Sequence, residues 1–148
     1  MDSAATPDRF MASTRDIIVR ARESVLKYKH THITPEHMLL SLMDTKDEAL
    51  ANGMKTSTAS PEQIKVLLQH HLRIGEVVLK EDQITFSERA KRVIETAREE
   101  SIRAKADQIG PQHLLLGLAM VRNTVAGAVL AAVDLKEDNL RAALGAKI

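Results

Sequence analysis

The sequence predicts an all-α fold, and three of its features support that prediction. The chain has 148 residues, of which 44% are hydrophobic and only 2% aromatic, so its core must be built from aliphatic side chains. Such a core suits packed helices better than sheets. Apolar residues recur at helical spacing, and we find no convincing strand ladder. The third feature is an internal repeat.

The repeat is visible over two long stretches of the chain. Residues 10–43 align without a gap to residues 86–119, and 12 of the 34 aligned pairs are identical. ITPEHMLLSL at 33–42 returns as IGPQHLLLGL at 109–118. A fixed offset predicts two copies of one structural unit packed together. We therefore expect a single domain over residues 1–148, with a first repeat at about 8–72, a linker at about 73–84 and a second repeat at about 85–146.

Each repeat is predicted to contain four helices. Thr6-Pro7 marks the start of the first helix, because a capping residue followed by proline is typical of a helix N-terminus. Thr34-Pro35 starts the second helix in the same way, and a short third helix is expected at 48–54. The stretch SPEQ at 60–63 resembles the capping box of a fourth helix.

The second repeat follows the same order. Its helices are expected to begin near Thr85, at Gly110-Pro111, at about residue 124, and at the capping-box pattern Asp134-x-x-Glu137. The full prediction is eight helices, arranged as two four-helix repeats that are related by a pseudo-twofold axis.

The composition argues against several functional classes. The net charge is +1 and evenly spread, so phosphate contacts with a nucleic acid have little electrostatic support. The absence of cysteine removes disulfides, thiolate zinc sites and a cysteine nucleophile. No apolar run reaches the roughly 18–20 residues that span a bilayer, and MDSAATPDRF at the N-terminus lacks a signal-peptide hydrophobic region. We expect a cytoplasmic protein with no nucleic-acid or membrane partner.

The histidines near the repeated motif raise the question of a metal site or a catalytic pair. His30, His32 and His37 lie close together, but HTHITPEH is not HExxH, and the second repeat keeps only His113 of this group. The motifs GxSxG, GxxxxGK[ST] and GxGxxG are also absent. We expect no metal, cofactor or catalytic residue, and expect His37 and His113 to hydrogen-bond locally at helix starts. A small hydrolase or metalloprotein using Glu36 and His37 remains an alternative.

The two linked motifs resemble a known family. FSERAKRVIETAREES at 86–101 with IGPQHLLLGL, and the looser copy FMASTRDIIVRARES at 10–24 with ITPEHMLLSL, are similar to the Clp N-terminal domain. This repeat domain precedes the ATPase modules of Clp-type AAA+ unfoldases such as ClpC, ClpA and ClpB. The resemblance covers about residues 8–146. It implies an eight-helix pseudo-symmetric fold and a non-enzymatic module for protein quality control, proteolysis and the stress response.

The resemblance also implies a set of binding residues. In the ClpC branch, the acidic position of each motif helps to bind arginine-phosphorylated proteins, and Glu36 matches the first such position as a partner for a guanidinium group. Gln112 stands at the second position and cannot supply a charge. Ser87 keeps the hydroxyl that follows the motif phenylalanine, whereas Met11 replaces it in the first repeat.

Two phenylalanines complete the predicted set. Phe10 and Phe86 match family positions close to ligand and adaptor surfaces, and each equally suits a core anchor at a helix start. The candidate binding residues are therefore Phe10, Glu36, Phe86, Ser87 and Gln112. The implied partners are adaptor proteins, unfolded or tagged substrates and Clp ATPase domains. The alternative within this class is a free-standing regulator that competes for Clp adaptors or substrates.

Overall fold

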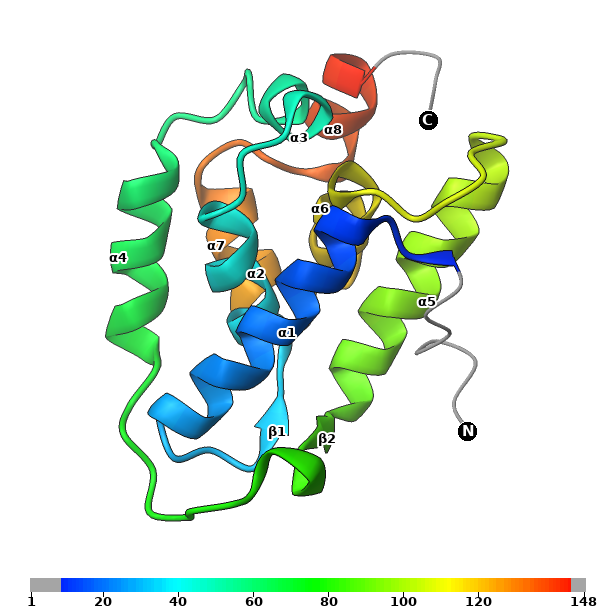
Figure 1. Ribbon diagram of the computed structural model, residues 1–148. Coiled ribbons are helices and arrows are strands. Elements are labelled where there is room, and N and C mark those ends of the chain that lie inside the picture. Colours follow the sequence, from blue (N-terminus) through cyan, green and yellow to red (C-terminus); the bar gives the residue numbers. More distant parts are fainter. Residues whose placement is uncertain (1–8, 145–148) are drawn as a thin grey trace.

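The computed structural model describes residues 9–144, which form eight α-helices and one pair of very short strands (Figure 1). The helices of the first half are α1 (Ala12–Lys27), α2 (Pro35–Met43), α3 (Glu48–Gly53) and α4 (Pro61–His71). Those of the second half are α5 (Glu88–Arg103), α6 (Pro111–Met120), α7 (Val125–Ala132) and α8 (Glu137–Leu144). The linker contains a single 3₁₀ turn, Glu81–Gln83. The predicted all-α class and the helix order are confirmed.

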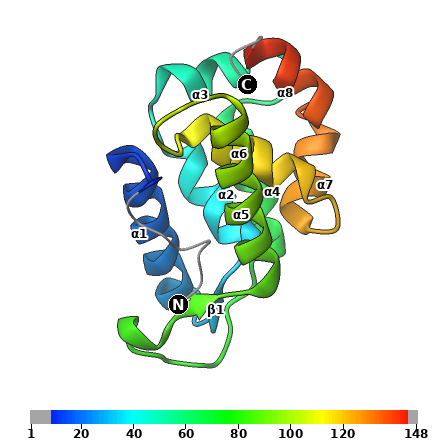
Figure 2. The same cartoon turned by 90° about the vertical axis from the view of Figure 1, so that its right-hand side faces the viewer.

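The two halves pack together with the pseudo-twofold relation that the repeat predicts. The long helices α1 and α5 each pack on the buried helix that follows, α2 and α6, and these two meet at the centre. The remaining helices pair across the repeats, α3 with α8 and α4 with α7. Both views show α3 beside α8 at one end of the molecule (Figures 1 and 2). Each repeat therefore completes its packing with helices of the other.

A strand pair joins the repeats just before α2 and α5. β1 (His32–Ile33) runs parallel to β2 (Thr85–Phe86), and the Ser87 N–H donates to the Ile33 carbonyl at 3.0 Å. The sequence predicted no strand ladder, so this pair is a correction. Two residues per strand are too few to show an alternating apolar pattern, which explains why the sequence did not reveal it.

The same pairing recurs at the other side of the pseudo-twofold axis. Phe10 forms a parallel bridge with Ile109, and the Met11 N–H donates to the Ile109 carbonyl at 3.1 Å. The Thr14 hydroxyl donates to the same carbonyl at 2.8 Å. Backbone groups of each repeat thus bond to backbone groups of the other, because a buried N–H or C=O group needs a hydrogen-bond partner.

Several helix starts follow the predicted capping residues. α2 begins at Pro35 after the N-cap Thr34, and α4 begins at Pro61 after the N-cap Ser60. At α4 the capping box is complete, because Ser60 Oγ accepts the Gln63 N–H at 3.2 Å and Gln63 Oε1 accepts the Ser60 N–H at 2.8 Å. These starts depend on neighbouring residues alone, so a sequence pattern is enough to place them.

Both long helices, α1 and α5, begin later in the chain than the sequence predicted. α5 begins at Glu88 rather than near Thr85, because Thr85–Phe86 form β2. In the first repeat Phe10 is in the bridge to Ile109 and the helix begins at Ala12. The predicted Thr6-Pro7 start itself lies outside the described residues. Strand pairing across the repeats therefore takes the residues that helical periodicity had assigned to helices.

The predicted capping box of α8 is wrong. Asp134 lies outside the helix in a left-handed conformation with φ of 63°, a geometry that asparagine and aspartate tolerate better than most residues. The helix begins at Glu137, and Asn139 Oδ1 accepts the Lys136 N–H at 3.2 Å. The cap is therefore formed two residues further along the chain than Asp134.

α2 and α6 approach the long helices at equivalent small residues. Ser41 on α2 donates its hydroxyl to the Ile17 carbonyl at 2.8 Å. The repeat-related residue on α6 is Gly117, and a Cβ there would lie 2.7 Å from the Val93 carbonyl oxygen. The contact between α5 and α6 is therefore too close for any residue larger than glycine.

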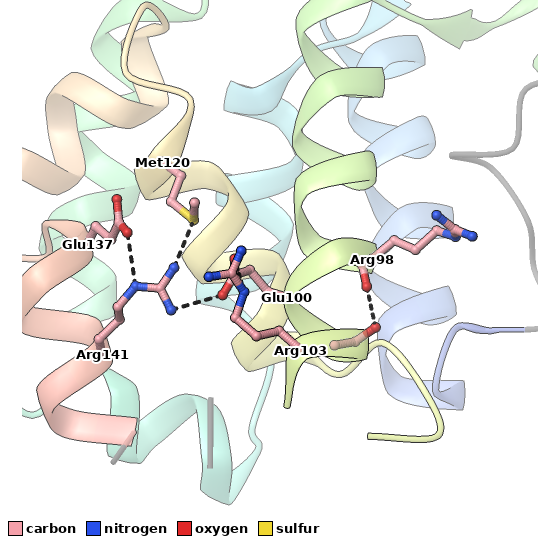
Figure 3. Close-up of polar contacts among 7 residues, drawn as sticks. Arg98, Glu100, Arg103, Met120, Glu137 and Arg141 are labelled. Carbon is pink, nitrogen blue, oxygen red and sulfur yellow. Dashed lines mark hydrogen bonds and ion pairs between the residues drawn. The ribbon is translucent and has the colours of Figure 1, made fainter. Parts of the chain in front are cut away.

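A buried ion pair fastens α8 to α5 (Figure 3). The Glu100 side chain on α5 is 1% exposed, and its Oε1 lies 3.0 Å from Nη1 of Arg141 on α8. Glu137 orients the same arginine, with Oε2 2.9 Å from Nε, while Arg103 Nε lies 3.6 Å from the other Glu100 oxygen. A buried carboxylate needs a balancing charge, so the position of α8 depends on Arg141.

Gly117→Ala is expected to lower the free energy of unfolding by about 1–3 kcal/mol, because the added Cβ forces α5 and α6 apart. Gly53→Ala is the matched control, since the nearest atom to a Cβ there is a Leu144 methyl carbon at 3.4 Å. The control should be neutral or slightly stabilising, because alanine favours helix more than glycine. Urea unfolding followed by circular dichroism measures both. Equal losses in the two variants would contradict the close approach described here.

Arg141→Met is expected to destabilise the protein by about 3 kcal/mol, because it leaves Glu100 buried without its main counter-charge. The double variant Glu100→Gln/Arg141→Met removes the charge as well and should recover at least half of that loss. Arg103→Met serves as the control and should cost less than about 1 kcal/mol, since that side chain is 66% exposed. A double variant no more stable than Arg141→Met would show that the buried charge is not the cause.

Candidate functional site

The starts of three helices from the two repeats meet at one pocket. The N-cap residues of α2, α5 and α7 are Thr34, Ser87 and Thr124, and all three line it. The pocket has a volume of about 550 Å³, and its other lining residues are Pro35, Glu36, Glu88, Arg89, Asn123 and Val125. The β1–β2 pair creates this neighbourhood, because the Ser87 N–H bonds to Ile33, the residue before Thr34.

The cap side chains already serve their helices as acceptors. Ser87 Oγ accepts the Ala90 N–H at 3.1 Å, and Thr124 Oγ1 accepts the Gly127 N–H at 2.9 Å. The Thr124 hydroxyl also donates to the Val121 carbonyl at 3.1 Å. Within residues 9–144 the Ser87 hydroxyl donates to no acceptor. Ser87 therefore brings a free O–H donor to the pocket.

Glu36 supplies the half-buried carboxylate of the pocket. Burial raises the pKa of this carboxyl group above its ordinary value. The backbone N–H of Ala126 on α7, the N–H of Glu36 itself and the positive charges of Arg89 and His71 favour the ionised form and oppose that rise. A cationic group that entered the pocket would act in the same direction. Glu36 thus brings a half-buried carboxyl group to the pocket, with the guanidinium group of Arg89 nearby.

The pocket brings together two of the five residues predicted from the sequence, Glu36 and Ser87, which come from different repeats. Phe10 and Phe86 do not line it. Phe10 is 5% exposed in the core, and Phe86 is half-buried in β2 and packs against the same core. Both phenylalanines thus occupy the anchor position that the sequence offered as the alternative to ligand contact.

Gln112 lies at the start of α6, in the place that Glu36 occupies on α2, and it is not part of this pocket. Its side-chain amide folds back over Gly110, where an added Cβ would collide with it. The repeat-related residue of Gly110 is Thr34, which has a side chain in that position. The Gln112 amide therefore occupies the space that a capping side chain fills in the first repeat.

Arg89, Asn123 and Thr124 line the pocket but were not among the residues predicted from the sequence. The sequence carried a signal for two of them: residue 124 was predicted as a helix start, and Arg89 lies two residues after Ser87 in the repeated motif. No spacing in the sequence shows that the start of α7 lies against the start of α2. That neighbourhood results from packing of α7 on α2 and α4, which is a tertiary contact.

The described part of the chain contains neither a cluster of metal ligands nor a single membrane-spanning helix. No three histidine, cysteine, aspartate or glutamate side chains of residues 9–144 gather in a way that would hold a metal ion. In the same residues no single helix has the length and apolar character to cross a bilayer, and α6 with α7 meets that test only as a pair bent by 98°.

Comparison with known proteins identifies the family. Residues 9–144 match the family profile of the Clp repeat (R) N-terminal domain. The chain belongs to this family. It is 29% identical over 134 residues to ClpC, the ATP-binding subunit of an ATP-dependent Clp protease, from Staphylococcus saprophyticus, and 30% identical to ClpC from Staphylococcus epidermidis. Each match covers 90% of this chain but 16% of the relative, so the chain spans about one sixth of their length.

Solved structures of Clp N-terminal domains share the fold. The N-terminal domain of ClpD from Arabidopsis thaliana has a TM-score of 0.69 at 24% identity, covering 92% of this chain and 94% of that one. The Hsp104 N-terminal domain from Candida albicans has a TM-score of 0.71 at 18% identity, covering 91% and 88%. That of the ClpV1 ATPase from E. coli has a TM-score of 0.73 at 17% identity, covering 90% and 82%. The predicted family and fold are both confirmed.

The two motif histidines of this Clp repeat domain bond locally, as the sequence predicted. The Thr34 N–H donates to His37 Nδ1 at 3.0 Å, and the Gly110 N–H donates to His113 Nδ1 at 2.9 Å. Both rings are buried, with 1% and 3% exposed. Each histidine therefore completes the capping of its helix from the third helical position, as a glutamine or glutamate does in a capping box.

Acid is expected to weaken the fold through His37. Burial, followed by the neighbouring His30, lowers the pKa of His37 from 6.5 to about 4. As the pH falls, His37 therefore binds a proton near pH 6.5 in the unfolded chain but only near pH 4 in the folded chain. The stabilisation is complete above pH 6.5 and is lost as the pH falls toward 4, with a contribution of about 3 kcal/mol.

The variant His37→Gln tests this assignment, because glutamine keeps a side-chain acceptor for the Thr34 N–H but does not titrate. Urea unfolding at pH 7.5 and pH 4.5 should show a smaller loss of stability in this variant than in wild type. The control His32→Gln changes an exposed histidine and should behave as wild type. An identical pH dependence in wild type and His37→Gln would rule His37 out as the source.

Proposed function

We propose that this domain is a protein-binding module of a Clp-type chaperone or protease system, which engages substrate or adaptor proteins and carries out no chemistry itself. Family membership supports the general role, since the relatives are ATP-binding subunits of Clp proteases. The observation that carries the proposal for this chain is the pocket, which joins a half-buried carboxylate to a guanidinium group and a free hydroxyl. Such a set suits recognition of charged protein side chains.

The pocket offers complementary chemistry to a side chain that bears both charges. The Glu36 carboxylate suits a guanidinium or ammonium group, whereas Arg89 and the Ser87 hydroxyl suit an acidic group beside it. The helix starts add positive dipole ends on the same side. Phosphoarginine carries both kinds of group on one side chain, which is the ligand that resemblance to the ClpC branch implies. We propose the pocket around Glu36 as its site.

The second repeat lacks the corresponding features. Gln112 is neutral and covers Gly110, and Met11 stands where Ser87 supplies a hydroxyl in the pocket. The proposed stoichiometry is therefore one ligand per chain. A metal or hydrolytic role for Glu36 and His37 has less support, because both ring nitrogens of His37 are engaged, Nδ1 by Thr34 and Nε2 by His30 at 2.9 Å.

We propose that the chain acts as one unit, with repeats at about 8–72 and 85–146 joined by residues 73–84. Its proposed partners are adaptor proteins, unfolded or tagged substrates and Clp ATPase domains. Capture of any of these by the purified domain supports the role. Empty pull-downs with a cognate Clp ATPase, its adaptors and an unfolded protein would overturn it.

Isothermal titration calorimetry with free phosphoarginine tests the proposed site. Wild type should bind one molecule per chain, and Glu36→Gln should bind at least about tenfold more weakly, because a charge-assisted hydrogen bond contributes about 1.5–3 kcal/mol. Glu62→Gln is the matched control: Glu62 follows a proline at the start of α4 as Glu36 does at α2, but it is exposed and outside the pocket. The control should bind as wild type.

Three results of this titration would count against the site. An absence of heat with wild type would end the phosphoarginine proposal, and the pull-downs would still decide the protein-binding role. Two molecules bound per chain would contradict the difference between the repeats. Equal weakening in Glu36→Gln and Glu62→Gln would show that net charge, rather than the pocket, governs binding.

A further inference from the structure

A second pocket, in the first repeat, lies where the second repeat contains its buried ion pair. It has a volume of about 140 Å³ and lies between α1, α2 and α4. The equivalent helices of the second repeat are α5, α6 and α8, which carry Glu100, Met120 and Arg141 (Figure 3). The two places are related by the pseudo-twofold axis, so their side chains can be compared one by one.

This comparison shows that the first repeat keeps the positive charges and lacks the carboxylate. The repeat-related pairs that share a positive charge are Lys27 with Arg103 and Lys65 with Arg141. Ser24 stands in the position of Glu100, whose buried carboxylate lies 3.0 Å from the Arg141 guanidinium. A serine side chain is uncharged and too short to reach the equivalent lysine. The space that the Glu100 carboxylate fills in one repeat is therefore open in the other.

The pocket has an excess of positive charge. Among the described residues that line it, Arg20, Lys27 and Lys65 each carry a positive charge. The carboxylate in the same described lining is that of Asp44, which binds Lys65 but is exposed. Asp16, outside the pocket, lies 3.2 Å from Arg20 Nε. Within residues 9–144 Lys27 forms no ion pair, so its charge is not balanced there.

The pocket also has hydrogen-bond donors that the domain does not use. Ser24 and Tyr28 line it and are half-buried, and their hydroxyls donate to no acceptor of residues 9–144. The Lys27 ammonium group lies 5.9 Å from the centroid of the Tyr28 ring. Ammonium and hydroxyl groups donate hydrogen bonds, and an ionised carboxylate accepts them with both oxygens. The free donors and the excess charge thus suit the same kind of ligand.

We propose that this pocket binds a carboxylate from another molecule, an aspartate or glutamate side chain of a bound protein, in the place that Glu100 occupies in the second repeat. A volume of about 140 Å³ holds several water molecules of about 30 Å³ each, and thus has room for a carboxylate group. Lys27 and Asp44 are exposed, so the pocket is open to solvent. The bound carboxylate accepts hydrogen bonds from Lys65 and Ser24.

This site is separate from the pocket around Glu36. No residue that lines one of the two pockets lines the other. The ligand is also different, because the second pocket needs a carboxylate alone and offers cations where the first offers Glu36. A failure of phosphoarginine binding therefore leaves this proposal intact, and a failure here leaves the phosphoarginine site intact.

A titration with short peptides, followed by NMR of the full chain, tests the site. The probe is the peptide Gly-Gly-Glu-Gly-Gly with both ends blocked, and Gly-Gly-Gln-Gly-Gly is its neutral control. The glutamate peptide should shift the amide signals of Ser24 and Asp44, and the glutamine peptide should leave them in place. Sodium acetate, compared with sodium chloride at equal ionic strength, should shift the same signals but bind more weakly than the peptide.

Ser24→Glu supplies the missing carboxylate from within the chain, as the second repeat does. It should weaken binding of the glutamate peptide at least about tenfold, because the added side chain occupies the site and balances its charge. Val19→Glu is the matched control, since it adds the same charge to α1 at a position that is 41% exposed and outside the pocket. The control should bind the peptide as wild type.

Lys65→Met removes the cation that corresponds to Arg141 and should weaken binding at least about fivefold. Lys55→Met makes the same charge change at an exposed residue outside the pocket and should have no effect. Unchanged binding in Ser24→Glu would overturn the proposal, as would equal weakening in Lys65→Met and Lys55→Met. Tighter binding of acetate than of the peptide would show a site for free carboxylates and contradict the protein ligand.

Discussion

The structure depends on the reciprocal pairing of the two repeats before their helices begin. The Ser87 N–H bonds to Ile33 and the Met11 N–H bonds to Ile109, so each repeat satisfies backbone groups of the other. The cross-repeat contacts of α3 with α8 and of α4 with α7 extend the same relation. The pocket is a direct consequence, because this pairing is what places Ser87 beside the start of α2. A binding site made of Glu36 and Ser87 therefore requires both repeats to be folded.

Duplication kept the fold and allowed the chemistry of the two copies to differ. The positions that set helix starts and packing remain similar, such as His37 with His113 and Ser41 with Gly117. The position proposed for ligand binding has diverged, since Glu36 corresponds to Gln112. The polar anchors differ as well. Glu100 holds α8 in the second repeat, whereas the equivalent residue of the first repeat is Ser24, and the first repeat instead uses its extra histidine, His30, to hold the linker.

Features set by neighbouring residues could be predicted from the sequence, and features set by packing could not. The caps at Thr34 and Ser60 were predicted correctly, because each depends on residues within one helical turn. The starts of the long helices were misplaced because Phe10 and Thr85 enter strand pairs with distant chain. Glu36 and Ser87 were selected through the family resemblance, yet their shared pocket depends on Thr124 and Arg89, whose approach only the tertiary structure reveals.

We propose that the two repeats form one cooperative unit, and the unfolding of each repeat within the full chain tests this most directly. Urea titration followed by NMR can monitor the native amide signals of Leu39 on α2 and Leu115 on α6, which are both buried and repeat-related. Reciprocal pairing predicts one transition, with the same midpoint and the same slope for both signals. A Leu39 signal that disappears at a urea concentration where Leu115 remains native would contradict the account.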